Sequence, residues 1–254
     1  ARAGAKVAIS SRKAEHVDAA VKALLREGLE VVGIPANMGT AADAHELAAR
    51  TVEHFDGIDI IVNNAATNPV FGPLQHATDD AFEKIFSVNL KGPLELCRTA
   101  HTVMAQRGAG AIVNVASIGG VSPEAGLGLY SVSKAALVSL TKVMAQEWGA
   151  DGIRANVICP GLIKTRFSQA LWPTMWPVLH SSWRPMRRRI ARAACTWLTV
   201  DTSRDARCHC AECVGTGGAS CHGTGLRARH VGATRVAAAA RCLGAKRAGP
   251  RRAG

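Results

Sequence analysis

The sequence of 254 residues predicts an α/β domain in which helices cover both faces of a doubly wound parallel sheet. Short apolar segments alternate with amphipathic segments of helical length, which is typical of that fold class. With 48% hydrophobic and 20% charged residues, the chain can bury one sizeable core. Neither a run of eighteen apolar residues nor a basic leader followed by an apolar segment is visible, so we expect a cytoplasmic protein that spans no membrane.

Five segments are predicted to be buried strands because they are short and rich in apolar residues. They are residues 6–10, 30–34, 58–62, 111–115 and 154–158. Helical periodicity predicts helices over residues 12–26, 41–55 and 79–106, and a further helix that carries Tyr130. Gly28 ends the first helix, and acidic residues occupy the first turn of the third.

Tyr130, the single tyrosine of the chain, stands four residues before Lys134 at the start of the last helix. Positions i and i+4 share a helix face, so the phenol and the ammonium can point into the same space. An ammonium beside a phenol would lower the tyrosine pKa toward the range of a working acid or base. Taken alone, the pair could equally be part of a solvated helix face.

Ligands of parallel α/β sheets bind beyond the carboxyl ends of the strands. The unusual residues fall at those ends: Ser11, Arg12, Asn63, Ser117, Pro160 and Gly161. No acid follows the first strand to bond a ribose 2′-hydroxyl, whereas Ser11 and Arg12 suit a 2′-phosphate. If the sheet binds a dinucleotide, as the resemblance described next implies, these residues favour NADP(H), with NAD(H) possible. A merely basic first turn of an exposed helix would leave that preference open.

Several of these motifs, in one order, resemble those of short-chain dehydrogenases/reductases over residues 1 to about 172. The matching motifs are Asn63-Asn64-Ala65, Asn89 in Val-Asn-Leu-Lys-Gly, Ser117 after Ile-Val-Asn-Val, Tyr130-x-x-x-Lys134 and Pro160-Gly161-x-x-x-Thr165. The loop after Asn63 and residues 161–172 are most similar to the NADP-dependent carbonyl and retinal reductase branch. The resemblance implies a Rossmann-like sheet and an NAD(P)-dependent oxidoreductase that interconverts a small-molecule carbonyl and an alcohol.

The resemblance also implies roles for individual residues. Tyr130 would exchange a proton with the substrate oxygen, and Lys134 would lower the tyrosine pKa and bind the nicotinamide ribose. Ser117 would hold the carbonyl oxygen, and Asn89 would anchor a water that relays protons to Lys134. Asn63 would lie near the adenine ribose and stabilise its strand. The cofactor contacts implied are Ser11, Arg12, Asn63, Ala65, Tyr130, Lys134, Pro160, Gly161, Ile163 and Thr165.

Three of these residues, Ser117, Asn89 and Asn63, could also have purely structural roles. Ser117 could be a strand-end serine, Asn89 an asparagine that bonds nearby backbone, and Asn63 a turn residue. No metal ligand is expected among the site residues.

The start of the sequence departs from the family pattern. No glycine-rich turn precedes Lys6, and Ala66 stands where the family usually has glycine. Backbone N–H groups of such a turn hold the pyrophosphate at a helix N-terminus. We therefore expect a sheet that lacks its first, central strand, a gap in that sheet, and weak dinucleotide binding. The expectation corresponds to a sequence shortened at its N-terminus.

Residues 173–254 form a compositional region of their own. They hold 15 of the 31 Lys and Arg, only three of the 19 Asp and Glu, and six of the eight Cys. We predict an irregular, basic tail after a partial domain of residues 1–172. Three interpretations compete: a nucleic-acid-binding tail, a zinc site around Cys208, Cys210 and Cys213, or a GC-rich gene read out of frame. The abrupt change of composition at Trp172 favours the third, with a disordered tail.

The family commonly forms tetramers through the helices at residues 79–106 and 130–148 and through C-terminal contacts. A homo-oligomer is therefore implied, although the unusual C-terminal region conflicts with it. An inactive remnant, or a protein that binds nucleic acid through its arginines, is the rival from another functional class. The sequence does not identify the carbonyl substrate, because the region that shapes the pocket in the family has no counterpart after Trp172.

Overall fold

The computed structural model describes residues 1–163, 165 and 167–169, and the backbone alone of residues 195–199. The chain divides into two units, Ala1–Gly215 and Thr216–Gly254, and every described residue belongs to the first. The division predicted between residues 172 and 173 therefore falls outside the described residues.

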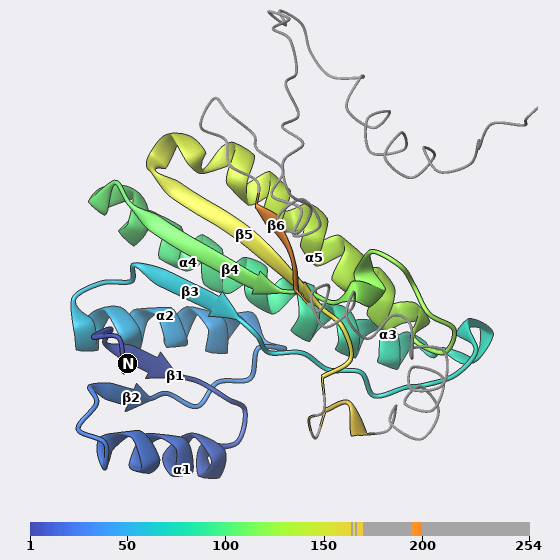
Figure 1. Cartoon of the computed structure of the whole chain (residues 1–254), viewed down its shortest axis with the longest axis horizontal. Helices are drawn as coiled ribbons and strands as arrows, with labels where there is room; N and C mark the ends of the chain where they lie inside the picture. The colour runs from blue at the N-terminus through green and yellow to red at the C-terminus, as the bar shows by residue number, and fades with distance from the viewer. Residues whose placement is uncertain (164, 166, 170–194, 200–254) are drawn as a thin grey trace, which may run out of the picture. The chain divides into compact units, whose positions relative to one another are not determined.

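Strands and helices alternate along the described chain as the sequence predicts (Figure 1). The strands are β1 (Val7–Ile9), β2 (Val31–Gly33), β3 (Ile60–Asn63), β4 (Gly110–Val115), β5 (Ile153–Pro160) and β6 (Cys195–Thr199). The α-helices are α1 (Ala14–Leu25), α2 (Ala41–Phe55), α3 (Asp79–Phe86), α4 (Gly92–Arg107) and α5 (Gly128–Glu147). Short 3₁₀ turns lie at Leu74–His76, Ile118–Gly120 and Gly149–Asp151.

The strands form two sheets rather than one. β1 pairs with β2, and β3, β4, β5 and β6 form a second sheet in that order. The β1–β2, β3–β4 and β4–β5 pairs are parallel, with Ile112 opposite both Ile61 and Ala155. No described strand pairs with the free edges of β1 and β3. The gap expected in the sheet is therefore confirmed as a break between two sheets.

The strand β6 corrects one prediction. Residues 195–199 were expected to belong to an irregular tail, but they pair antiparallel with β5, with Asn156 opposite Thr199. Their sequence, Cys-Thr-Trp-Leu-Thr, is rich in residues that favour strands, and the edge of β5 offers unpaired backbone groups. The other tail predictions, including the zinc site around Cys208, lie outside the described residues.

A second correction concerns the helix expected over residues 79–106. A five-residue π-helix, Ser87–Lys91, separates α3 from α4 and carries the buried Asn89. Pro93 follows at the start of α4, and a proline has no N–H to donate to the carbonyl four residues earlier. The hydrogen-bond ladder is therefore interrupted at Asn89, and the wider turn is the local solution.

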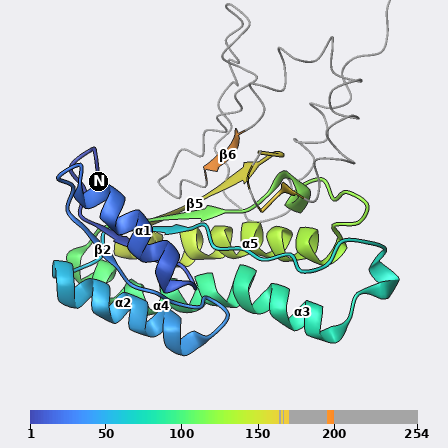
Figure 2. The ribbon, with the colours of Figure 1, turned by 90° about the horizontal axis from the view of Figure 1, so that it is seen from below.

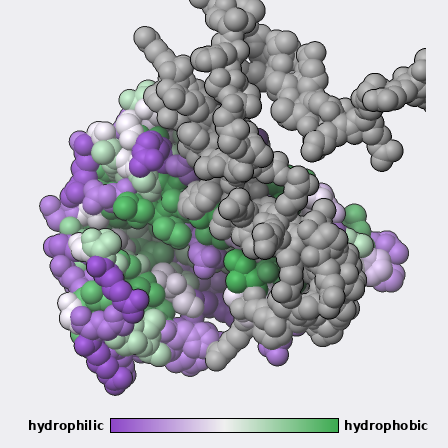
Figure 3. All heavy atoms as spheres, in the orientation of Figure 1, coloured by the Kyte–Doolittle hydropathy of each residue, from purple (hydrophilic) through white to green (hydrophobic). Residues whose placement is uncertain are grey.

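The main core lies between the second sheet and the helices α2, α4 and α5, which cover one face of it (Figure 2). Ile112, Ala155 and Val157 on the strands and Met104 and Met144 on the helices are completely or almost completely buried. The opposite face of β3 is open: Ile60 is 63% exposed and Val62 60%. Figure 3 shows apolar surface over this part of the molecule.

None of the described helices is both long enough and apolar enough to cross a bilayer.

Candidate active site

Four sequence-predicted residues meet where β4 ends and α5 begins. Ser117 follows β4, Tyr130 and Lys134 occupy successive turns of α5, and Asn89 lies in the π-helix before α4. The nitrogen of Lys134 is 5.8 Å from the centroid of the Tyr130 ring. The i, i+4 spacing therefore places the phenol and the amine on one side of α5, as expected.

Lys134 is one of the most deeply buried side chains, with 1% of its surface exposed. Its Nζ donates a hydrogen bond of 2.7 Å to the backbone carbonyl oxygen of Val115. Burial lowers the pKa of Lys134 from 10.5 to about 8, because the interior disfavours the charged form, and interaction with Cys159 opposes this in part. The amine can therefore change its charge close to neutral pH.

Tyr130 corrects an expectation about its acidity. Burial raises the pKa of its phenol, and the Ser117 hydroxyl offsets part of that rise. The predicted lowering by Lys134 is absent, because desolvation of the ring dominates and the Lys134 nitrogen is bound to the Val115 carbonyl. Tyr130 is therefore a protonated phenol at neutral pH in this structure, which suits a proton donor.

Ser117 begins the 3₁₀ turn that follows β4. Its Oγ accepts a hydrogen bond of 3.1 Å from the backbone N–H of Gly119. Because Oγ accepts this bond, its own hydrogen stays available to donate toward the phenol or a substrate oxygen. The serine is thus oriented by local backbone, and its proposed contact with a substrate stays a prediction.

Asn89, in the π-helix, is completely buried and bonds both the loop after β3 and the helix α5. Its Oδ1 accepts from the backbone N–H of Thr67 at 2.8 Å, and its Nδ2 donates to the Thr67 carbonyl at 3.0 Å. The same Nδ2 donates to Ser133 Oγ at 3.0 Å, and Ser133 donates to the Tyr130 carbonyl at 2.7 Å. Asn89 thus ties the loop after β3 to the helix that carries Tyr130.

Asn63 does not present its side chain to a ligand at the strand end. The side chain is buried, and its Nδ2 donates to Asn114 Oδ1 at 2.8 Å, while Asn114 donates to Thr141 Oγ1 at 2.8 Å. This chain of polar side chains joins β3, β4 and α5, which is the arrangement that the predicted stabilising role requires. The predicted contact with an adenine ribose would need the Asn63 backbone.

The other residues predicted to contact a cofactor lie at the carboxyl ends of β1, β3 and β5. Ser11 and Arg12 are exposed after β1, and neither side chain forms a hydrogen bond or an ion pair with the described residues. The neighbouring Lys13, in contrast, pairs with Glu15 at 3.4 Å. Pro160 and Gly161 are half-buried, whereas Ala65, Ile163 and Thr165 are exposed. The structure brings none of these into hydrogen-bond contact with Ser11 or Arg12.

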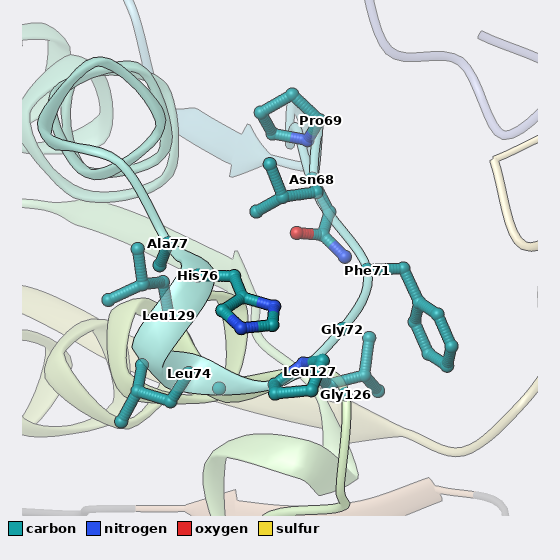
Figure 4. A pocket seen from close by; sticks show the side chains of 13 residues that line it. Asn68, Pro69, Phe71, Gly72, Leu74, His76, Ala77, Gly126, Leu127 and Leu129 are labelled. Carbon is teal, nitrogen blue, oxygen red and sulfur yellow. The ribbon is translucent and has the colours of Figure 1, made fainter.

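A cavity of about 340 Å³ is lined in part by Gly128 and Leu129, which directly precede Tyr130 in α5. Figure 4 shows it between the loop after β3 and the start of α5, with the side chains of Asn68 and His76 as its polar groups. Its lining is Asn68, Pro69, Val70, Phe71, Gly72, Pro73, Leu74, His76, Ala77, Gly126, Leu127, Gly128 and Leu129. Sequence analysis missed this cavity, because loop residues have no periodicity that indicates their direction. Prolines and glycines clustered after a strand end were the available signal.

A metal centre is not visible in the parts of the chain that the structure describes. No three His, Cys, Asp or Glu side chains within them form a group that could hold an ion. The cysteines whose side chains the structure describes, Cys97 and Cys159, are buried and form no disulfide.

Comparison with known sequences agrees with this geometry. Residues 1–176 match the sequence model of a family described as short chain dehydrogenase. The chain is 48% identical over 172 residues to dehydrogenase/reductase SDR family member 4 of Oryctolagus cuniculus, covering 68% of this chain and 66% of that protein. The Homo sapiens protein of the same name is 44% identical over 172 residues, covering 68% and 62%. The chain thus spans less than two thirds of the length of these relatives.

Solved structures have the same fold. A gluconate 5-dehydrogenase from Burkholderia cenocepacia, in complex with NADP and tartrate, superposes with a TM-score of 0.64 at 28% identity, over 67% of this chain and 66% of that one. A levodione reductase superposes with a TM-score of 0.65 at 30% identity, over 71% and 70%. A xylitol dehydrogenase bound to NAD⁺ gives 0.61 at 26% identity, over 63% and 62%.

Proposed function

This chain belongs to the short-chain dehydrogenase family, and on that premise we propose that it interconverts a carbonyl and an alcohol with Tyr130 as the acid or base. The observation that carries the proposal is the meeting of Tyr130, Lys134, Ser117 and Asn89 at the end of β4. These four side chains come from three separate segments. The cavity, whose lining includes Leu129 directly before Tyr130 in the chain, provides room for a small-molecule carbonyl substrate.

The proton chemistry follows from the pKa shifts. A phenol whose pKa is raised holds its proton at neutral pH and can give it to a carbonyl oxygen that becomes an alkoxide. The Ser117 hydroxyl would hold that oxygen in place. The phenolate that remains is stabilised if Lys134 turns from the Val115 carbonyl toward it as an ammonium. The arrangement can therefore supply the proton that carbonyl reduction needs.

NADP(H) is the redox partner that we propose, and when bound it supplies or accepts the hydride. The exposed guanidinium of Arg12, with no ion-pair partner among the described residues, fits a 2′-phosphate, and Ser11 adds a hydroxyl beside it. No acid stands after β1 to favour a free 2′-hydroxyl. Ala65, Pro160, Gly161, Ile163 and Thr165 are proposed to bind the rest of the cofactor at the ends of β3 and β5.

The substrate branch and the setting of the protein are further parts of the proposal. Similarity to dehydrogenase/reductase SDR family member 4 supports the carbonyl and retinal reductase branch. We propose a cytoplasmic protein that does not act on nucleic acid or on membranes; the homo-oligomer that the family implies conflicts with the unusual composition after Trp172. One similar Homo sapiens protein carries the word mitochondrial in its name, so fractionation of cells is the direct test of location.

Titration with NADPH and a carbonyl compound tests the proposed function. The full chain should bind NADPH saturably and oxidise it when a ketone is added. The Tyr130→Phe variant should keep the binding and lose at least about a hundredfold in turnover, the usual contribution of a positioned acid. Equal turnover by Tyr130→Phe, or no saturable binding of either NADPH or NADH, would refute the proposal.

A further inference from the structure

A buried acceptor without a partner stands at the wall of the cavity. The Oδ1 atom of Asn68 is buried and receives no hydrogen bond from the residues that the structure describes. Asn68 also lines the cavity, and Figure 4 shows its amide turned toward the interior rather than outward like Phe71. Buried polar atoms are nearly always paired, so an unpaired acceptor beside a cavity indicates a missing donor.

The position of Asn68 relative to Tyr130 is set by hydrogen bonds. Thr67, the preceding residue, is held through both its N–H and its carbonyl by Asn89. Asn89 also bonds Ser133, which bonds the carbonyl of Tyr130. The loop residue and the acid are thus carried by one buried frame. The terminal χ2 torsion of Asn68 is soft, so Oδ1 can adjust to a group in the cavity.

Apart from Asn68 and His76, the side chains that line the cavity are apolar, whereas backbone groups contribute polar surface. Leucines from both walls, Leu74, Leu127 and Leu129, face a space whose other polar side chain is His76. A ligand for this space has an apolar body and few polar groups. Leu129, which lines the cavity, directly precedes Tyr130 in the chain, so we place the donor on a substituent close to the reacting carbonyl.

We propose that Asn68 determines substrate specificity by accepting a hydrogen bond from a hydroxyl group next to the reacting carbonyl of an otherwise apolar substrate. The substrate class is then the hydroxy ketone, of which an aryl hydroxymethyl ketone is the simplest member. This inference rests on the proposed function for the identity of the reacting group. A site with a buried acceptor discriminates strongly against analogues that lack the donor, because the acceptor then stays unpaired.

Three ketones of similar size test the proposal on the full chain: 2-hydroxyacetophenone, 2-methoxyacetophenone and propiophenone. The first two have similar inductive effects on the carbonyl, but only the first has a donor. Both kcat/KM with NADPH and affinity by ligand-observed NMR are measured. The hydroxy ketone should exceed the methoxy ketone by about tenfold, the value of one neutral hydrogen bond.

Two variants of Asn68 separate the hydrogen bond from other effects. Asn68→Leu keeps the volume but removes the acceptor, so the preference for the hydroxy ketone should fall to about one. Asn68→Asp keeps an acceptor at the same place and should keep the preference. Propiophenone, which has neither group, should respond least to either change. If Asn68→Leu fails to fold, the Asn68→Asp variant and the comparison of the hydroxy ketone with the methoxy ketone on the wild type still decide.

The outcomes distinguish the inference from the proposed function. Reduction of all three ketones at similar rates, lost in Tyr130→Phe, would overturn the role of Asn68 and leave the reductase proposal standing. Tenfold tighter binding of the hydroxy ketone that disappears in Asn68→Leu, without turnover, would support the role of Asn68 and count against the reductase. If the wild type binds no ketone in preference to another, the inference is refuted.

Discussion

Asn89 and Ser133 are joined by a hydrogen bond of 3.0 Å in the interior, so the π-helix before α4 is tied to the helix of Tyr130. Asn89 is completely buried, and its two amide atoms serve three partner groups on Thr67 and Ser133. The residue therefore supports both the fold and the site. That double role can be measured.

Replacing Asn89 with leucine should lower the free energy of unfolding by about 2–4 kcal/mol, because it leaves buried partner groups unsatisfied. Ser133→Ala is the matched control: it removes one of these bonds and places a good helix former in α5, so about 1 kcal/mol or less is expected. Urea unfolding of the three proteins measures both. Equal stability of Asn89→Leu and the wild type would contradict the role of Asn89.

Lys134 predicts how stability depends on pH. Its pKa is about 8 in the folded chain and 10.5 ordinarily, so between these values the unfolded state binds more protons. Stability should therefore rise with pH from about 8 to 10.5, by up to about 3 kcal/mol. The raised pKa of Tyr130 acts in the opposite direction, but only above pH 10.

The Lys134→Met variant isolates this effect, since every other titrating group is shared. Urea unfolding of both proteins at pH 7, 8, 9 and 10 should show the wild type gaining on the variant above pH 8. A constant difference across that range would mean that Lys134 has an ordinary pKa in the folded chain.

Arg12 predicts the choice of cofactor. Arg12→Asp removes the guanidinium and introduces a charge that repels a 2′-phosphate, so the ratio of NADPH to NADH affinity should fall at least about tenfold. Lys13→Ala is the control, because Lys13 already pairs with Glu15. Fluorescence titration with both cofactors measures the ratio. If the ratio of NADPH to NADH affinity is unchanged in Arg12→Asp, Arg12 has no role in the choice of cofactor.

The open face of β3 predicts self-association. Ile60 and Val62 are exposed on one face, and the strand has no described partner on its outer edge. Exposed apolar strands at a free edge favour aggregation. The double variant Ile60→Thr and Val62→Thr should scatter less light at the same concentration, with little change in stability.

Ile61, between these two residues, is the matched control for β3. Only 6% of it is exposed, on the face that packs against the helices. Ile61→Thr should cost about 2 kcal/mol or more, because it removes apolar packing and buries a hydroxyl. If all three substitutions destabilise the chain alike, the outer face of β3 is covered in solution.

Local patterns predicted most of the elements. The predicted helix over residues 41–55 coincides with α2, whose apolar positions recur at helical spacing and whose last residue precedes Asp56 in the left-handed conformation. The predicted helix over residues 79–106 was wrong at its centre, because Pro93 leaves one hydrogen bond unmade. The direction of the Asn63 side chain was also beyond sequence analysis, since its partner Asn114 is 51 residues away.

The sequence by itself determined the alternation of strands and helices and placed Tyr130 and Lys134 on one side of α5. Both follow from periodicity within a few residues. Only the tertiary structure decided the charge state of the pair. Lys134 is desolvated by elements distant in the chain and is bound to Val115, 19 residues away, and burial raises the pKa of Tyr130. Desolvation is the sum of all surrounding atoms, so no local pattern contains it.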